Sequence, residues 1–307
     1  MNKSPHLPVL LNEVVNSFKD IKSGYFVDCT LGYAGHSSEM LKKFLHIKHI
    51  GIDRDIEAIN FSKEKLKDFQ DRSTIYKGTF ADIFPALKEE PIVGVLADFG
   101  VSSLQLDKVE RGFSFKSGVL DMRMDKDASL SAYDVVNSYS SEKLEYIFKN
   151  YGEIREYREL TNAIVEKRSI KPITSAFELS NIISKVVHRH GKINPSTLAF
   201  QAIRIEVNGE LSQIESLLDS IEKKHYSGEI VTLITFHSLE DRLVKNRFTK
   251  WAKNCICDEM AFRCTCGNNH SMGKLLNKKP ITANLEELKY NPRSRSAKLR
   301  SFCFNNV

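Results

Sequence analysis

The stretch from Tyr25 to His36 constrains the fold of this chain more than any other part of its sequence. An apolar run ends at Asp28, a turn containing Gly32 and Gly35 follows, and apolar residues then recur at helical spacing. Glycine at such a turn lets the backbone approach a ligand closely, and the following helix offers free N–H groups at its positive end. The stretch therefore predicts a strand, a tight loop and a helix, as in the first unit of a doubly wound sheet.

This turn alone does not identify a ligand. The phosphate-binding pattern G-x-G-x-x-G is absent, because only two residues separate Gly32 from Gly35, and a plain strand-to-helix connection would have the same sequence. However, Asp53 ends a second apolar run 21 residues after Gly32. Dinucleotide folds place a carboxylate at about this distance, where it accepts hydrogen bonds from ribose hydroxyls. The two features together favour a nucleoside cofactor.

Further strands are expected at 73–80, 92–98 and 229–236, with helical stretches between most of them, and a short final strand at 301–304. This alternation predicts an α/β fold with a parallel, doubly wound sheet. Ligands in such sheets gather beyond the carboxyl ends of the strands. The predicted strand ends are Asp28, Asp53, Phe80 and Asp98.

The alternation stops after Asp98. The segment from Arg111 to Asp125 is polar and aromatic without a clear period, which is typical either of a binding surface or of a strap over the sheet edge. A purely helical pattern follows. Its segments are predicted at 132–139, 141–151, 158–168 and 177–190.

We therefore expect a small helical insertion at 106–195. It would interrupt a discontinuous domain made of 1–105 and 196–307. A long helix from Pro195 through Leu218 is expected to return the chain to the sheet.

The charge of the chain is unevenly distributed. Residues 242–300 hold 14 Lys or Arg against 4 Asp or Glu, whereas the whole chain carries +6, so the remainder is net acidic. A basic segment beside an acidic body indicates a polyanionic partner, although a solvated basic tail has the same composition. Cations alternate with aromatic residues at 245–253, which suits RNA.

Composition excludes some classes of protein. The chain is 41% apolar and 27% charged, as in soluble globular proteins. It contains no apolar run of about 18 residues and begins without a signal-peptide core. We expect a cytoplasmic protein with no membrane partner.

Four cysteines are clustered near the basic segment. Cys255, Cys257, Cys264 and Cys266, followed by His270, form the pattern C-x-C-x6-C-x-C-x3-H. Four thiolates could hold zinc, but structural zinc sites more often use C-x2-C, so free thiols or a reversible redox pair are the alternatives. The surrounding cations predict lowered thiol pKa values.

Several sequence blocks together resemble one family. They are Leu31–His36, Gly51–Asp55, Leu96–Ser103 with Gln105, Glu110–Phe115, Leu120–Asp125, Phe200–Arg204, Phe236–Arg242 and Asn291–Ser296. In this order, across nearly the whole chain, they are similar to the bacterial 16S rRNA (cytosine-N4)-methyltransferases called RsmH or MraW. The chain differs at Ala34, where many members have glycine, and in its cysteine cluster, which is not a general family feature.

The resemblance implies a class I S-adenosylmethionine-dependent methyltransferase fold, Rossmann-like, with a helical substrate-recognition insertion. The implied substrate is a cytidine of the decoding centre, cytidine 1402 of 16S rRNA, within the small ribosomal subunit. The family also implies a homodimer. The residues implied to contact S-adenosylmethionine are Ala34, Gly35, His36, Asp53, Phe80, Asp98 and Gln105, of which Gln105 is assigned from the family alone.

Two residues are candidates for the chemistry. Asp98 and the backbone carbonyls after it stand where many amino-methyltransferases have D-P-P-Y, so they are candidates to orient the cytosine amine. His237 is a candidate to accept the released proton, with a structural histidine as the alternative. RNA contacts are predicted for Arg111, Arg123, Lys245, Arg247, Arg293, Arg295 and Lys298.

Three other functions compete with this one. An NAD-linked oxidoreductase lacks support because G-x-G-x-x-G and a second nucleotide-binding half are absent. A non-catalytic RNA-binding or ribosome-assembly protein would not need the strand-end acids. An N4-cytosine DNA methyltransferase is disfavoured by the missing D-P-P-Y.

Overall fold

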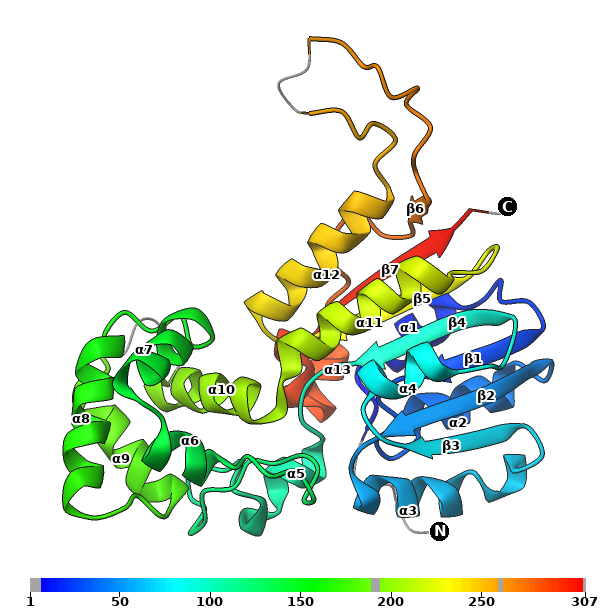
Figure 1. Cartoon of the computed structure of the whole chain (residues 1–307). Coiled ribbons are helices and arrows are strands. Elements are labelled where there is room, and N and C mark those ends of the chain that lie inside the picture. The colour runs from blue at the N-terminus through cyan, green and yellow to red at the C-terminus, as the bar shows by residue number, and fades with distance from the viewer. Residues whose placement is uncertain (1–6, 189–193, 259–261, 306–307) are drawn as a thin grey trace. The chain divides into compact units, whose positions relative to one another are not determined.

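The computed structural model describes residues 7–188, 194–258 and 262–305, with the side chains of residues 103 and 104 excepted (Figure 1). Internal contacts divide the chain into two compact units. The first comprises Met1–Gly100 and Gln213–Val307, and the second comprises Val101–Ser212. We call them the sheet unit and the helical unit and describe each by itself.

Within the described residues, seven strands form one sheet in the order β3-β2-β1-β4-β5-β7-β6. Strands β1 to β5 pair in parallel, whereas β7 runs antiparallel to both β5 and β6. The bounds are β1 Gly24–Asp28, β2 Ile47–Asp53, β3 Ser73–Lys77, β4 Ile92–Asp98, β5 Ile230–Thr235, β6 Gly273–Leu275 and β7 Lys298–Phe304. The predicted class I, doubly wound fold is confirmed.

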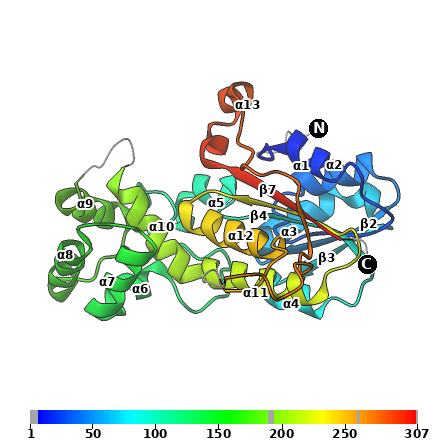
Figure 2. The ribbon, with the colours of Figure 1, turned by 90° about the horizontal axis from the view of Figure 1, so that it is seen from above.

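Helices cover both faces of this sheet, as Figure 2 shows for α1 and α2 on one side and α4 and α11 on the other. Alternate residues of a strand point to opposite faces, so Phe26 packs into the cluster with α1 and α2 while Val27 packs into the cluster with α4 and α12. The helices of this unit are α1 Leu11–Ser17, α2 Gly35–Lys43, α3 Ile56–Lys65, α4 Phe80–Ala86, α11 Glu210–Lys224, α12 Ser238–Trp251 and α13 Leu285–Tyr290, with short 3-10 turns η1 Lys67–Phe69 and η3 Pro292–Ser296.

Two details of the sheet differ from the prediction. The third strand ends at Lys77 rather than Phe80, because Thr79 caps α4 by accepting the Asp82 N–H at 3.2 Å. The last strand begins at Lys298, three residues earlier than predicted, and β6 had no recognisable pattern because it is only three residues long.

The helical unit contains one apolar core, which includes Phe148, Leu160 and Leu179. Serine caps begin three of its helices, as Ser131, Ser140 and Ser175 each accept a backbone N–H. Its elements are α5 Ser103–Asp107, η2 Val109–Arg111, α6 Ala132–Ser138, α7 Ser141–Asn150, α8 Tyr157–Ile170, α9 Ala176–Val186 and α10 Pro195–Asn208. The predicted helix at 177–190 corresponds to α9, and its last two predicted residues lie outside the described residues.

The long helix predicted from Pro195 through Leu218 is two helices. Gly209 adopts the left-handed conformation (φ 59°, ψ 34°) at the end of α10, which is the common way for a helix to stop. Because Ala199, Phe200 and Ile203 lie in the core of the helical unit, the contacts group α10 with that unit rather than with the sheet. The second unit is therefore 101–212, compared with the expected 106–195.

Candidate active site

The turn between β1 and α2 has an unusual backbone. Gly32 and Ala34 both adopt φ of 50°, in the left-handed region. For alanine this conformation costs about 1–2 kcal/mol, and such strain is concentrated at functional sites. Ala34, which stands where many members of the resembled family have glycine, thus adopts a conformation that glycine would adopt without strain. Ala34 also precedes α2 without offering a side-chain cap, so the positive end of that helix is not closed by a side chain.

Gly35 and His36 hold the segment that precedes α1. The His36 imidazole is buried, and its Nε2 lies 2.8 Å from the Val9 carbonyl oxygen. A Cβ added at Gly35 would come within 3.1 Å of the Pro8 ring, so a larger residue would displace this segment. These two predicted cofactor residues therefore also have a structural role.

The carboxylate of Asp53 connects the end of β2 to the glycine turn. Its Oδ2 accepts the Gly32 N–H at 2.7 Å, and its Oδ1 accepts the Asp55 N–H at 2.8 Å. Burial raises the pKa of Asp53, although these two hydrogen bonds oppose the shift. Since each carboxylate oxygen has more than one lone pair, Asp53 can also accept hydrogen bonds from a ligand.

Asp28 and Asp98 end the neighbouring strands β1 and β4, with Asp28 paired to Leu96, two residues before Asp98. Asp28 accepts the Ser37 hydroxyl at 2.5 Å and the Thr30 N–H at 3.2 Å, and burial raises its pKa to about 6. The Thr30 hydroxyl oxygen in turn accepts the Asp98 N–H at 2.6 Å.

The Asp98 carboxylate contains a buried acceptor atom. Its Oδ1 is buried and has no hydrogen-bond partner among the described residues. Burial raises the pKa of Asp98 well above its usual value, and the negative charges of Asp28 and Glu240 raise it further. An unpaired buried acceptor costs about 1–3 kcal/mol, so a ligand that donates a hydrogen bond or carries positive charge would bind favourably here.

An aromatic pair lies next to these acids. Phe80 begins α4 and is mostly buried, and its ring centroid is 5.8 Å from that of Phe99, which directly follows Asp98. Phe80 is thus near the strand ends, as predicted from the position of the third strand, although it belongs to a helix.

His237 caps α12. Its Nδ1 accepts the Glu240 N–H at 3.5 Å, and its Nε2 lies 3.1 Å from a Glu240 carboxylate oxygen. The same carboxylate accepts the Phe236 N–H at 2.7 Å. These contacts fit the structural interpretation of His237, and its role as a proton acceptor stays a prediction. Sequence reasoning overlooked Glu240, which the spacing of a capping box, three residues after the cap, would have indicated.

Gln105 lies on α5 in the helical unit. It is buried, its side-chain Oε1 accepts the Ser102 N–H at 3.0 Å, and its own N–H donates to the Ser102 hydroxyl at 3.3 Å. Its contact with a cofactor stays a prediction.

Two of the arginines predicted to bind RNA order the loop that contains them. Arg111 is buried and donates to the backbone carbonyls of Arg123 and Met124 at 3.1 and 2.9 Å. Arg123 pairs with Asp121 through two hydrogen bonds of 2.9 and 2.7 Å. Arg111 is therefore buried inside its loop in this structure rather than on a binding surface. Its guanidinium donates hydrogen bonds to two backbone carbonyls there.

The other predicted cations differ in their exposure to solvent. Arg247 lies 2.6 Å from Asp219 and 3.0 Å from Glu222, and Lys298 lies 3.2 Å from Asp241. Lys245, Arg293 and Arg295 are exposed. The exposed residues are the better candidates for contact with phosphates.

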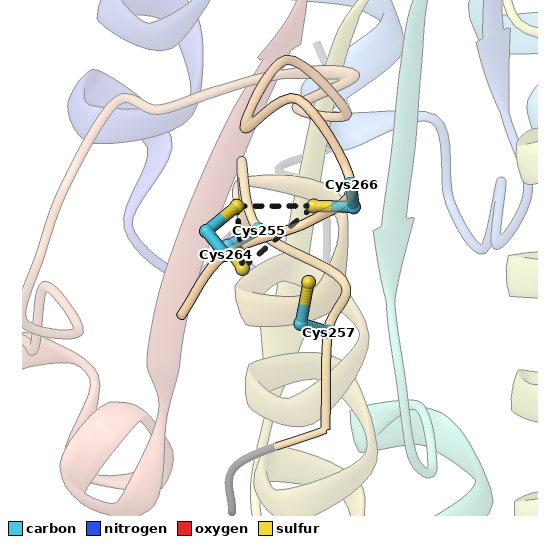
Figure 3. Close-up of side chains that lie close together, drawn as sticks. All are labelled: Cys255, Cys257, Cys264 and Cys266. Carbon is cyan, nitrogen blue, oxygen red and sulfur yellow. Dashed lines mark hydrogen bonds between the residues drawn. The ribbon is translucent and has the colours of Figure 1, made fainter. Parts of the chain in front are cut away.

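The clustered cysteines come together in the loop between α12 and β6 (Figure 3). Hydrogen bonds from the backbone N–H groups of Asn268 and Ile256 lower the pKa of Cys266 to about 5. Hydrogen bonds from the backbone N–H and the side chain of Thr265 lower the pKa of Cys257. The direction agrees with the prediction for these two thiols, but the main cause is backbone hydrogen bonding rather than neighbouring cations. The prediction is wrong for Cys255: the Cys257 backbone hydrogen bond lowers its pKa, but hydrogen bonds with the Cys264 and Cys266 side chains outweigh this and raise it to about 11.

Comparison with a family model and comparison with individual proteins point to the same family. The model of the MraW methylase family matches residues 3–304. The ribosomal RNA small subunit methyltransferase H of Sulfurovum sp. (strain NBC37-1) is 66% identical over 304 residues, covering 99% of each chain. Proteins with the same name from Aliarcobacter butzleri and Wolinella succinogenes are each 54% identical, with at least 98% of each chain covered.

Among the residues that the structure describes, no helix combines the length and the apolar character needed to cross a bilayer.

The buried Asp28 predicts a pH dependence of stability. Its carboxyl ionises near the ordinary value of 3.8 in the unfolded chain but at about 6 in the folded protein. As pH rises, the unfolded state loses its proton first, so a stabilising contribution present below about pH 4 is lost as pH passes 6. This shift corresponds to about 3 kcal/mol. Urea unfolding from pH 4 to 8 should therefore show wild type losing up to this amount relative to Asp28→Asn.

Asp71→Asn, at an exposed position, serves as the control for loss of one charge. Parallel pH profiles for wild type and Asp28→Asn would contradict the assignment.

Proposed function

Since this chain belongs to the MraW methylase family, we propose that it transfers a methyl group from S-adenosylmethionine to N4 of a cytidine in 16S rRNA. The proposed target is cytidine 1402, in the decoding centre of the small ribosomal subunit. One observation supports a catalytic site above all: Asp28, Asp53 and Asp98 lie at neighbouring strand ends around a strained, left-handed turn. Relatives named as methyltransferases of small-subunit rRNA support the choice of substrate.

The charge of this site fits the cofactor. S-adenosylmethionine carries a sulfonium and an ammonium group, and both are positive. Burial raises the pKa of Asp28, Asp53 and Asp98, and the negative charges of neighbouring acids raise each of these pKa values further. A bound cation would relieve this repulsion and stabilise the ionised acids.

We assign parts of the cofactor to particular residues. Asp53 would accept hydrogen bonds from the ribose hydroxyls, because its carboxylate is already fixed by the Gly32 and Asp55 N–H groups. Phe80 would lie against the adenine. The turn at Ala34 and Gly35 would face the amino-acid part, where the uncapped start of α2 favours a carboxylate.

When bound, S-adenosylmethionine supplies a methyl group that its sulfonium has already activated toward a nucleophile. The protein therefore has mainly to align the amine and exclude water. Cytosine N4 is a weak nucleophile because its lone pair is delocalised into the ring. The Oδ1 of Asp98, which has no partner among the described residues, can accept a hydrogen bond from an N–H of this amine and so localise the lone pair on nitrogen. The backbone carbonyls of Phe99 and Gly100 are further candidate acceptors.

Proton removal follows methyl transfer, since the attacking nitrogen becomes cationic and must lose a proton. Asp98 in its ionised form can accept that proton. We keep His237 as a second candidate, although its Nδ1 already caps α12 and its Nε2 faces Glu240.

Recognition of the ribosomal subunit is proposed to involve the helical unit and the exposed cations of the sheet unit. The target base has to leave its stack before it can reach a pocket. A cytoplasmic location and a homodimer belong to the same proposal, as do the RNA contacts of Lys245, Arg293 and Arg295.

The reaction can be tested directly on its substrate. Small subunits from a strain that lacks the enzyme should acquire N4-methylcytidine when incubated with the protein and S-adenosylmethionine, as nucleoside mass spectrometry can show. Mass spectrometry of defined RNA fragments should locate it at position 1402. Asp98→Asn keeps the size of the side chain but removes the ionised acceptor. We expect its kcat to fall by about 10²-fold or more, with cofactor affinity changed much less.

Asp53→Ala should instead weaken cofactor binding in calorimetry, because it removes the ribose acceptor and the anchor of the glycine turn. Methylation of a different RNA or of DNA would refute the substrate. Full activity of Asp98→Asn would refute its role.

The exposed cations predict a charge effect on subunit binding. Lys245→Glu on α12 and Arg295→Glu on η3 should each weaken binding about tenfold at low salt and reduce the salt dependence of the affinity, because fewer counterions are released. Lys63→Glu, an equal charge change at an exposed position of α3, is the matched control. Equal losses for all three variants in filter binding would mean that only net charge matters.

A further inference from the structure

The loop between α12 and β6 brings four thiols into one small volume. The Sγ atoms of Cys255, Cys257, Cys264 and Cys266 all lie within 4.8 Å of one another. Three of the separations are 3.6 Å for Cys255 to Cys264, 3.6 Å for Cys264 to Cys266 and 3.7 Å for Cys255 to Cys266. Figure 3 shows these side chains converging from two short chain segments.

These separations match a tetrahedral metal centre. A zinc–sulfur bond is about 2.3 Å long, so two sulfurs of a tetrahedral site are about 3.8 Å apart. A disulfide would instead require about 2.05 Å, and all four cysteines are free. The sulfur geometry therefore suits a shared cation rather than two covalent pairs.

The backbone supplies hydrogen bonds to the sulfurs. The Ile256 N–H donates to Cys266 Sγ at 3.4 Å, and the Thr265 N–H donates to Cys257 Sγ at 3.3 Å. Each C-x-C segment thus donates to a sulfur of the other. Four thiolates around Zn²⁺ carry a net charge of −2, and N–H donors of this kind offset that charge and fix the ligands.

His270, the fifth candidate ligand in the sequence, has another position. Its Nε2 lies 2.7 Å from the Cys266 carbonyl oxygen, and its backbone N–H donates to the Asn254 carbonyl at 3.0 Å. Together with the bond from the Met272 N–H to the Trp251 carbonyl at 2.8 Å, this closes the base of the loop. The ligand set is therefore the four cysteines.

Between Cys255 and Cys266, the described residues of the loop form no apolar core. Two apolar side chains described there are exposed, Ile256 by 63% and Phe262 fully. Figure 1 shows the loop projecting beyond the end of α12. A segment without an apolar core needs another source of folding free energy, and a structural metal is a common one.

We propose that Cys255, Cys257, Cys264 and Cys266 bind one Zn²⁺ ion that folds this loop. On binding, each thiol that still carries a proton releases it to solvent, and all four cysteines coordinate as thiolates. The site is structural because all four positions around the ion are filled by protein. This inference does not depend on the proposed methyl transfer.

Metal content tests the proposal. The full-length protein, purified under reducing conditions, should contain about one zinc per chain by inductively coupled plasma mass spectrometry. Cys255→Ser and Cys266→Ser should each lower this content at least tenfold after dialysis against a chelator. Cys303→Ser is the matched control, because Cys303 lies on β7, away from the cluster, and should retain the metal.

Two further measurements do not involve activity. Replacement by Co²⁺ should produce the visible absorption of tetrahedral thiolate coordination, and removal of the metal should accelerate trypsin cleavage after the exposed Arg263. The proposal is overturned if the fully reduced protein binds neither zinc nor cobalt. It is equally overturned if the metal found is iron, or if Cys303→Ser loses zinc as readily as Cys255→Ser.

Discussion

The hydrogen bond from the Gly32 N–H to Asp53, 2.7 Å long, is the interaction on which the candidate site depends. It ties the turn after β1 to the end of β2, and it fixes the carboxylate that we assign to the ribose. The turn can reach this carboxylate because Gly32 adopts a left-handed conformation without strain. Ala34 adopts the same conformation at a cost, and its backbone hydrogen bonds with Leu31 and Ser38 hold it there.

A second constraint is the burial of acids at the strand ends. Burial raises the pKa of both Asp28 and Asp98, and the charges of neighbouring acids raise both further, so the site without a cation is electrostatically unfavourable. Natural proteins retain such arrangements mainly where function requires them. The Oδ1 of Asp98 belongs to the same arrangement, because this buried acceptor has no hydrogen-bond partner among the residues that the structure describes.

Much of this could be predicted from sequence. The positions of Asp28, Asp53 and Asp98 followed from apolar runs that end in an acid, because parallel strands are buried and their carboxyl ends share one edge of the sheet. The break at Gly209 was missed, since the apolar pattern continues across it and one glycine does not reveal its φ. The roles of Arg111 and His237 were also hidden. Whether a cation orders a loop or faces RNA, and whether a histidine caps a helix, depends on contacts that sequence spacing does not specify.

The central claim, that the strand-end acids and the glycine turn form a cofactor site, is tested most directly by a crystal structure of the protein with S-adenosylhomocysteine. We predict both ribose hydroxyls within hydrogen-bond distance of the Asp53 carboxylate and the adenine ring against Phe80. Ligand density elsewhere on the molecule, or a ribose that does not contact Asp53, would contradict the account.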